Sequence, residues 1–540
     1  MSCIASEHEH DRGRWLRELV LPLLLAAGCE QADGGADGSP PATERRPNIV
    51  LIVIDTARAD HFSCYGYGSS TTPNVDALAA RGILFQNARS VAPWTLPAHM
   101  SMFTGLPPRD HGASWAAFSE PGKTSRELVE LAFTPAEPER MLATRLRTAG
   151  YRTYGFSPNP WVSRNHGFAE GFEEFTELWR KEKGAERLQV VKRLQGPRKT
   201  ARGEPEGAFE GSKSGLTVAG VQRMLAEHPR AEPFFLFVNF LDPHFPYDPP
   251  ETLRQRFGGT TKTVNAQKRK TTNELGMIAG LSLFTREDLL PLYDADLAAA
   301  DHAVGELVRC LESAGVFEDA LVVLTSDHGE LLGEKGRFSH QLYVDEPLMH
   351  VPLILKLPGG ERAGTSVNAP LVSNLDVYAT VLAAAGLEHA SAGGFSRDLA
   401  GASGNARELL IGEYQPSLSY LEQLQSLNDD FDVEAHLRDR FVVYTPEFRT
   451  ELVGQEAVDT TPLLGASETG ATDEALARAA RKAEHALVTY LAAKDVARSG
   501  KAGGQGGDAE TSAELEALGY VGSEEPEKPA PKPRKNKKRQ

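Results

Sequence analysis

Short, continuous apolar runs recur along the 540-residue chain. Runs of this kind, without polar alternation, are typical of strands that are buried on both faces of a parallel sheet. Patterns with helical spacing lie between the runs, so we predict an α/β fold with a large, mostly parallel sheet flanked by helices. The predicted strands are 48–55, 151–157, 232–244, 320–330, 351–359 and 408–414, and the predicted helices are 72–82, 139–150, 215–228, 286–315 and 374–387.

The alternating pattern weakens after about residue 400. One good strand at 440–448 and one long helix at 473–494 remain in this part of the chain. We therefore expect a main catalytic domain over 47–400 and a smaller α+β C-terminal subdomain over 401–522. The polar, Gly-rich segment 193–215 is expected to be a surface insertion.

The first 29 residues resemble an export signal. Three arginines precede the ten mostly apolar residues 19–28, and Cys29 follows them. Ten residues are too few to span a bilayer but suit the apolar region of a secretory signal. The sequence LLLAAGC also resembles a bacterial lipoprotein signal, so we expect an exported protein with a lipid anchor at Cys29, or plain secretion. Residues 30–46 then form a flexible linker.

Charge and cysteine content indicate which partners and which disulfide the protein could have. The formal net charge of −16 argues against nucleic acid as a partner of the folded body. Residues 523–540 carry seven Lys or Arg and predict a basic, disordered tail, with acidic polymers or lipid headgroups as a weaker alternative. Cys64 and Cys310 could pair, but a chain of this size does not require a disulfide.

Acidic and histidine side chains follow three of the predicted strands: Asp55 after the first, Asp242 and His244 after the third, and Asp327 and His328 after the fourth. The ligand crevice of an open parallel sheet lies at the carboxyl ends of its strands. Carboxylates gathered there repel one another unless a cation lies between them. We therefore predict that Asp55, Asp327 and His328 hold one divalent metal ion, whether calcium, manganese or zinc.

Residues 90–105 predict a loop that enters a helix, with Pro97 in its first turn and Gly105 at its end. Thr95 lies at the start of that helix. If the helix begins at the same sheet edge, its free amides and a nearby metal would favour an anionic oxygen on Thr95. On these grounds alone, Thr95 is either a helix cap or a nucleophile.

Six stretches of this sequence resemble the sulfatase family of the alkaline-phosphatase-like superfamily, in the family's order. The resemblance implies a large α/β domain with a small α+β C-terminal domain, which agrees with the pattern above. The stretches are 46–67, 71–88, 92–112, 239–250, 293–315 and 321–355.

The resemblance also implies roles for individual residues. Asp55, Asp327 and His328 match metal ligands of the family, while Thr56 stands where members often have a further Asp ligand. Thr95 occupies the nucleophile position.

Two more histidines match positions at the substrate. His244 corresponds to a histidine that contacts the transferred oxyanion or the leaving group, and His340 falls about where many sulfatases have a substrate-binding lysine. We expect one of them to protonate the leaving oxygen, since the ordinary pKa of histidine lies near neutral pH. Other histidines, His61, His111 and His350, are expected to be structural.

The nucleophile motif departs from the family pattern of Cys or Ser, then Pro, then Arg. Here it has Thr95, Pro97 and His99, and His99 is expected either to orient Thr95 or to touch the substrate. Threonine cannot be oxidised to formylglycine, so no formylglycine is expected. A threonyl ester must instead be cleared by water or another acceptor, as in related phosphodiesterases, phosphonate hydrolases and headgroup transferases.

Three functions follow. The first is a metal-dependent hydrolase of sulfate or related oxyanion esters. The second is a phosphodiester or phosphonate hydrolase or phospholipid-headgroup transferase, for which Asp242, His244 and His340 could bind a second metal. The third is an inactive surface-binding protein, which retention of the site residues disfavours.

Overall fold

A computed structural model describes most of the chain: residues 46–115, 131–179, 213–229, 231–267, 273–368, 371–389, 394–401, 407–463, 472–494 and 501–505. The predicted signal and basic tail, nearly all of the predicted linker and most of the predicted surface insertion lie outside these ranges. The described residues belong to one compact unit that begins at Arg46. None of the described helices is both long enough and apolar enough to cross a membrane.

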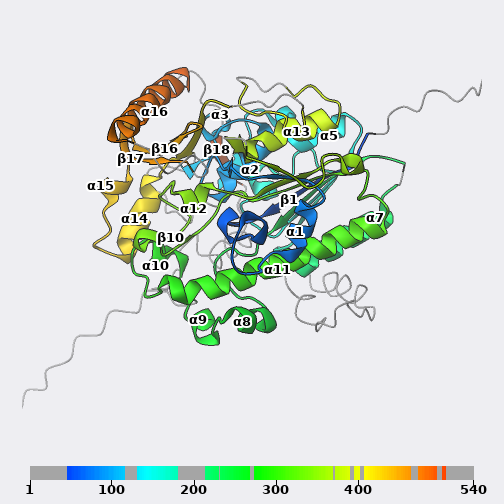
Figure 1. The fold of residues 1–540 in the computed structure, drawn as a ribbon, viewed down its shortest axis with the longest axis horizontal. Coiled ribbons are helices and arrows are strands. Elements are labelled where there is room, and N and C mark those ends of the chain that lie inside the picture. The colour runs from blue at the N-terminus through cyan, green and yellow to red at the C-terminus, as the bar shows by residue number, and fades with distance from the viewer. Residues whose placement is uncertain are drawn as a thin grey trace, which may run out of the picture. The chain divides into compact units, whose positions relative to one another are not determined.

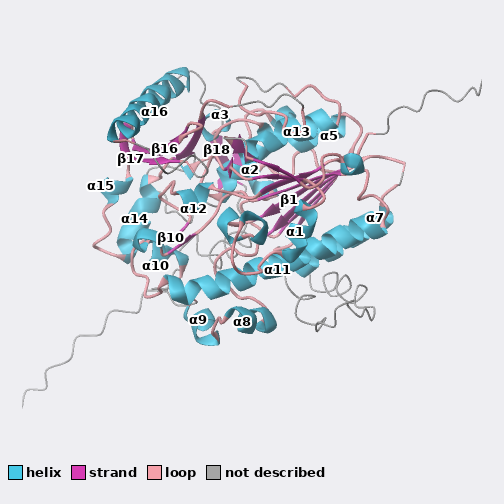
Figure 2. Cartoon of the chain, in the orientation of Figure 1, coloured by secondary structure: helices cyan, strands magenta, loops and turns pink. Residues whose placement is uncertain are grey.

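An eight-stranded sheet forms the centre of this unit (Figure 2). Five neighbouring strands, from β8 through β1, β7 and β5 to β6, run parallel, which confirms the predicted sheet. In sheet order the strands are β12 (Thr365–Val367), β2 (Ile83–Phe85), β11 (Leu353–Lys356), β8 (Leu321–Thr325), β1 (Ile49–Ile54), β7 (Phe234–Phe240), β5 (Arg152–Ser157) and β6 (Glu174–Glu177).

Strand β11 corrects one expectation, because it runs antiparallel to β8. The chain between β8 and β11 contains only short elements and no long crossover helix. A parallel partner would require such a crossover to return the chain to the opposite edge. The intervening loops therefore stay at the carboxyl edge of β8, where the functional side chains lie.

Helices cover both faces of the sheet (Figure 1). Alternate side chains of β1 enter two separate hydrophobic cores, as expected for a strand buried on both faces. One core packs against α2 (Thr95–Thr104), α5 (Leu142–Thr148) and α13 (Val377–Ala384), and the other against α1 (Pro73–Ala79), α7 (Lys213–Glu227) and α11 (Arg286–Ser313).

A second sheet of four antiparallel strands follows in the C-terminal part. It consists of β14 (Leu410–Tyr414), β15 (Arg440–Tyr444), β16 (Phe448–Val453) and β17 (Glu456–Pro462). The predicted strand 408–414 thus lies in this sheet and not in the parallel one. Helix α16 (Asp473–Lys494) packs on it through Ala483 and Leu487, as expected for a smaller α+β region.

Cys64 and Cys310 are both free thiols, so the optional disulfide does not form.

The remaining elements are short connections. The further strands and helices are β3 (Ala88–Arg89), α3 (Pro108–His111), β4 (Leu131–Thr134), α8 (Glu251–Phe257), α9 (Thr261–Ala266), α10 (Glu274–Ile278), β9 (Leu331–Leu332), β10 (Phe338–Ser339), α12 (Glu346–Met349), β13 (Val372–Ser373), α14 (Leu418–Leu427), α15 (Val433–His436) and β18 (Lys501–Gln505).

The end of α2 gives a test of the packing that holds this helix. Gly105 has φ +68°, and a Cβ there would lie 2.5 Å from Tyr378 Cδ1 on α13. Gly66 is a matched control, since its φ is +96° and a Cβ would meet nothing within 4 Å. We expect Gly66→Ala to cost about 1 kcal/mol of unfolding free energy from backbone strain alone. Gly105→Ala adds a steric clash and should cost about 2–4 kcal/mol.

Denaturant unfolding of both variants measures this difference. Equal losses at the two glycines would show that contact between α2 and α13 does not constrain the end of the helix.

Candidate active site

Three residues from two strand ends meet at the carboxyl edge of the parallel sheet. Asp55 directly follows β1, and Asp327 and His328 follow the neighbouring strand β8, which is in parallel register with β1. One ligand atom from each lies within 4.8 Å of the others, and all three side chains are fully buried. The structure thus brings together the three predicted metal ligands, which we call the first ligand group.

Each carboxylate of this group uses one oxygen to bond to the protein. Asp55 Oδ2 accepts a hydrogen bond of 2.7 Å from Asn159 Nδ2, and Asp327 Oδ1 accepts from the backbone N–H of Thr56 (3.2 Å) and His328 (2.9 Å). The other oxygens, Asp55 Oδ1 and Asp327 Oδ2, are buried without a hydrogen-bond partner. Such oxygens are costly unless something positive lies against them, so the two carboxylates fit a cation.

His328 is oriented for the same purpose. Its Nδ1 donates to the carbonyl of Gly329 at 2.8 Å, which leaves the lone pair on Nε2. A backbone carbonyl on the distal nitrogen is the usual way in which a protein fixes a metal-binding imidazole. His328 therefore fits a divalent cation together with Asp55 and Asp327.

The pKa shifts of Asp55 and Asp327 show why a cation suits this pair of carboxylates. Burial raises the pKa of Asp55 well above its usual range, and the nearby charge of Asp327 raises it further. Burial also disfavours ionised Asp327, but His328 and His99 outweigh that effect and hold its pKa well below the usual range. The two carboxylates cannot both be charged at low cost without a positive ion.

Thr95 lies at the first position of α2, next to the first ligand group. Its Oγ1 is 3.4 Å from His328 Nε2, and the side chain is fully buried. Trp94 occupies the N-cap position, and no side chain caps the helix. The Thr95 hydroxyl therefore makes no cap, and it faces the lone pair that points toward the predicted metal position.

His99 lies one helical turn further along α2. Its Nδ1 is 3.1 Å from the Thr95 carbonyl oxygen and 3.4 Å from Asp327 Oδ2. His99 thus contacts the residue that bears the candidate nucleophile and one of the candidate ligands. This geometry favours a positioning role over direct contact with substrate.

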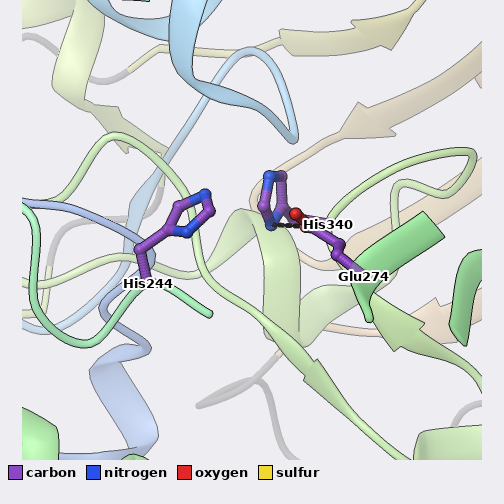
Figure 3. A group of neighbouring side chains, drawn as sticks. All are labelled: His244, Glu274 and His340. Carbon is purple, nitrogen blue, oxygen red and sulfur yellow. Dashed lines mark ion pairs between the residues drawn. The ribbon is translucent and has the colours of Figure 1, made fainter. Parts of the chain in front are cut away.

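His244 and His340 form a second ligand group with Glu274 (Figure 3), again with one ligand atom each within 4.8 Å of one another. The ring centroids of His328 and His340 are 4.6 Å apart, so the two groups adjoin. Asp242, which was expected to be available for a second metal, belongs to neither group; its Oδ2 accepts a hydrogen bond from Ser214 on α7.

The histidines of the two ligand groups do not have the ordinary, near-neutral pKa that was expected of them. Burial lowers the pKa of His328 and of His340 to about 3, and burial together with the charge of His340 lowers that of His244 well below its usual value. All three rings are therefore neutral near pH 7. They offer lone pairs and accept protons before they can donate any.

Sequence reasoning missed three residues that line this region. Asn159 follows β5 at the same sheet edge, so the strand-end rule applied to 151–157 would have found it. Glu330 ends the sequence SDHGE, and its Oε1 lies 3.2 Å from His340 Nδ1. Glu274 begins the short helix α10, in a segment with no readable signal, and only the fold places it beside His340.

The three histidines expected to be structural make contacts that suit that role. His61 Nδ1 lies 2.7 Å from Asp294 Oδ1, and His111 Nε2 lies 3.0 Å from Ser101 Oγ. His350 Nε2 lies 2.9 Å from the carbonyl oxygen of Gln86.

Comparisons with known proteins identify the family of this chain. A family model described as Sulfatase matches residues 47–387, a range that contains every residue of both ligand groups. The uncharacterized sulfatase YidJ of Escherichia coli (strain K12) is 25% identical over 359 residues, covering 64% of this chain and 69% of that protein.

Two further likenesses extend the comparison. An ulvan-active sulfatase of Formosa agariphila is 26% identical over 333 residues, covering 60% of this chain and 59% of that protein. The structure of a phosphonate monoester hydrolase from Silicibacter pomeroyi has the same fold, with a TM-score of 0.57 and 20% identity, covering 83% of this chain and 96% of that chain.

The pKa shifts predict how metal removal changes stability with pH. Burial raises the pKa of Asp55, Glu274 and Glu330, so in cation-free protein their contribution to stability is full below about pH 4 and is lost as pH rises. Bound cations oppose this loss, because they favour the ionised ligands. Asp327 has a lowered pKa, and its contribution is lost only as pH falls below about 4.

We therefore expect chelation to lower Tm by about 5 °C or more at pH 8 and by much less at pH 5. Thermal unfolding with and without chelator at the two pH values measures this. A Tm difference that is the same at both pH values would contradict the account of the buried carboxylates.

Proposed function

Because this chain belongs to the sulfatase family, we propose that it is a metal-dependent hydrolase of sulfate or related oxyanion esters with Thr95 as its nucleophile. One observation carries the proposal: the Thr95 hydroxyl lies at the start of α2, 3.4 Å from His328 Nε2 and beside the first ligand group. A hydroxyl at a helix N-terminus and beside a bound cation has a positive environment for its oxygen, which favours its ionisation.

Different residues assist the first step, in which Thr95 attacks the ester. A divalent cation held by Asp55, Asp327 and His328 would lower the pKa of an adjacent hydroxyl and offset the charge of an anionic ester. The Thr95 oxygen attacks the central sulfur or phosphorus atom, and the bond to the leaving oxygen breaks. The free amides in the first turn of α2 stabilise the negative charge that develops.

The neutral histidines move the protons. An imidazole at His244 or His340 accepts the proton of the attacking nucleophile and, once charged, protonates the leaving oxygen. In the second step the same ring accepts a proton from the water that attacks the threonyl ester and returns it to Thr95. His99 positions Thr95 throughout.

A second candidate, hydrolysis of phosphodiesters or phosphonate esters, is favoured by Thr95 itself. Formylglycine releases sulfate by collapsing to its aldehyde, whereas a threonyl ester must be hydrolysed at the central atom. Phosphorus esters are commonly cleaved by such a direct displacement. The fold shared with a phosphonate monoester hydrolase is compatible with this candidate.

Removal of the Thr95 hydroxyl tests the nucleophile. We expect Thr95→Ala to lower kcat by at least about 1,000-fold, because no other group replaces the attacking oxygen. The unfolding midpoint and the metal content should stay unchanged. Thr104→Ala is a matched control, since that hydroxyl lies on the same helix but bonds only to backbone groups: it donates to the Met100 carbonyl at 2.7 Å and accepts from the Leu106 N–H at 3.3 Å.

The assay uses aryl sulfate, aryl phosphate diester and aryl phosphonate substrates in parallel with metal-reconstituted protein. The substrate that the unaltered protein cleaves fastest assigns the ester class. Activity retained in Thr95→Ala would refute the nucleophile, and inertness of the unaltered protein toward all three would favour a binding protein.

We also infer export with a lipid anchor at Cys29. The support is the sequence alone: arginines, a short apolar segment and LLLAAGC in that order. Cys29→Ser should move the protein from the membrane fraction to the soluble fraction of expressing bacteria, whereas Cys3→Ser should not. Membrane association that persists in Cys29→Ser would exclude this anchor.

A further inference from the structure

The second ligand group, His244, Glu274 and His340, has the composition of a cation site in its own right. One ligand atom of each lies within 4.8 Å of the others, and all three side chains are at least 96% buried. Figure 3 shows His244 and Glu274 on either side of His340. Two imidazoles and a carboxylate form the donor set of many catalytic zinc sites.

Glu274 supplies an independent sign that something positive is bound here. Its Oε1 accepts a hydrogen bond of 2.5 Å from Ser339 Oγ and lies 3.6 Å from His340 Nδ1. Its Oε2 is buried without a hydrogen-bond partner. A buried, unpartnered carboxylate oxygen beside two neutral imidazoles is expensive in protein alone and favourable on a cation.

The charge of the whole region agrees with this. Four carboxylates are buried at one edge of the sheet: Asp55, Asp327, Glu274 and Glu330. In the part of the chain that the structure describes, no Lys or Arg side chain forms an ion pair with any of them. The guanidinium of Arg58, which reaches the Glu330 carbonyl, pairs instead with Asp60 and Glu334. One divalent cation would leave half of this negative charge uncompensated, whereas two would balance it.

We propose that the chain binds a second divalent cation, zinc or manganese, through His244, Glu274 and His340, next to the cation of the first ligand group. The inference goes beyond the proposed function and does not require Thr95 to be the nucleophile. With this cation bound, His244 and His340 are ligands, so the proton transfers described above apply to the protein that holds only the first cation. Glu330 positions His340, since its Oε1 lies 3.2 Å from His340 Nδ1. Two adjacent cations are the usual arrangement in enzymes that cleave phosphate esters, so this site also favours phosphorus esters over sulfate esters.

Metal content tests the proposal. The full-length protein is stripped with chelator, reconstituted with Zn²⁺ and measured by elemental mass spectrometry. We expect two zinc ions per chain in the unaltered protein and one in Glu274→Gln. The lost equivalent should be weakened by at least about 100-fold in competition with a chromophoric chelator. Glu422→Gln, an exposed glutamate on α14, is the matched control and should keep two.

Further variants separate this proposal from the others. Asp327→Asn should lose the equivalent of the first ligand group and keep that of the second, while Thr95→Ala should keep both whether or not it is active. A single zinc ion in the unaltered protein, or two in folded Glu274→Gln, would overturn the proposal. The stoichiometry of the unaltered protein decides the matter even if Glu274→Gln fails to fold.

Discussion

The burial of four carboxylates at one edge of a parallel sheet is the constraint on which the rest of this structure depends. Asp55, Asp327, Glu274 and Glu330 lie in a region where the protein supplies hydrogen bonds and neutral imidazoles but no paired basic side chain among its described residues. Desolvation of that much negative charge would strongly oppose folding. The region is therefore suited to cations, and three of these residues have a buried oxygen without a hydrogen-bond partner that a cation could contact.

The backbone meets this constraint by an unusual turn after β1. Thr56 has φ 54°, a left-handed conformation that costs a residue with a branched Cβ about 1–3 kcal/mol. In this conformation the Thr56 N–H donates a hydrogen bond to Asp327 Oδ1, and the Thr56 carbonyl accepts a 2.8 Å hydrogen bond from Tyr293 OH. Thr56 thus stands where the family often has a further aspartate, and its main chain orients a ligand instead.

Aromatic packing fixes the loops around this turn. Trp94, which precedes Thr95, stacks on Trp115 with ring centroids 4.9 Å apart, and both meet Trp161 edge-on. Trp115 Nε1 donates to Gln341 Oε1, next to His340. Loops from three parts of the chain are thereby held together, and a preorganised site of this kind needs little rearrangement during the reaction.

Local sequence patterns predicted those parts of the fold and site that depend on strand position. Asp55, Asp327 and His328 were predictable because each comes just after a buried strand and parallel strands end at the same edge. The direction of β11 was not, since the apolar run 351–359 looks the same in either orientation and only the route of the preceding loops decides it. Glu274 could not be predicted for a related reason. Its role depends on a tertiary contact with His340, and no local residue spacing indicates that contact.

The nucleophile and the two ligand groups are best understood together. A formylglycine enzyme carries out one displacement at sulfur and then releases sulfate by collapse to the aldehyde, without a second attack at sulfur. A threonine enzyme must carry out two displacements at the same central atom, and each develops negative charge on an entering and a leaving oxygen. Positive charge on both sides of that atom lowers both barriers. If Thr95 is the nucleophile and His244, Glu274 and His340 hold a cation beside His328, both features serve this one chemical requirement.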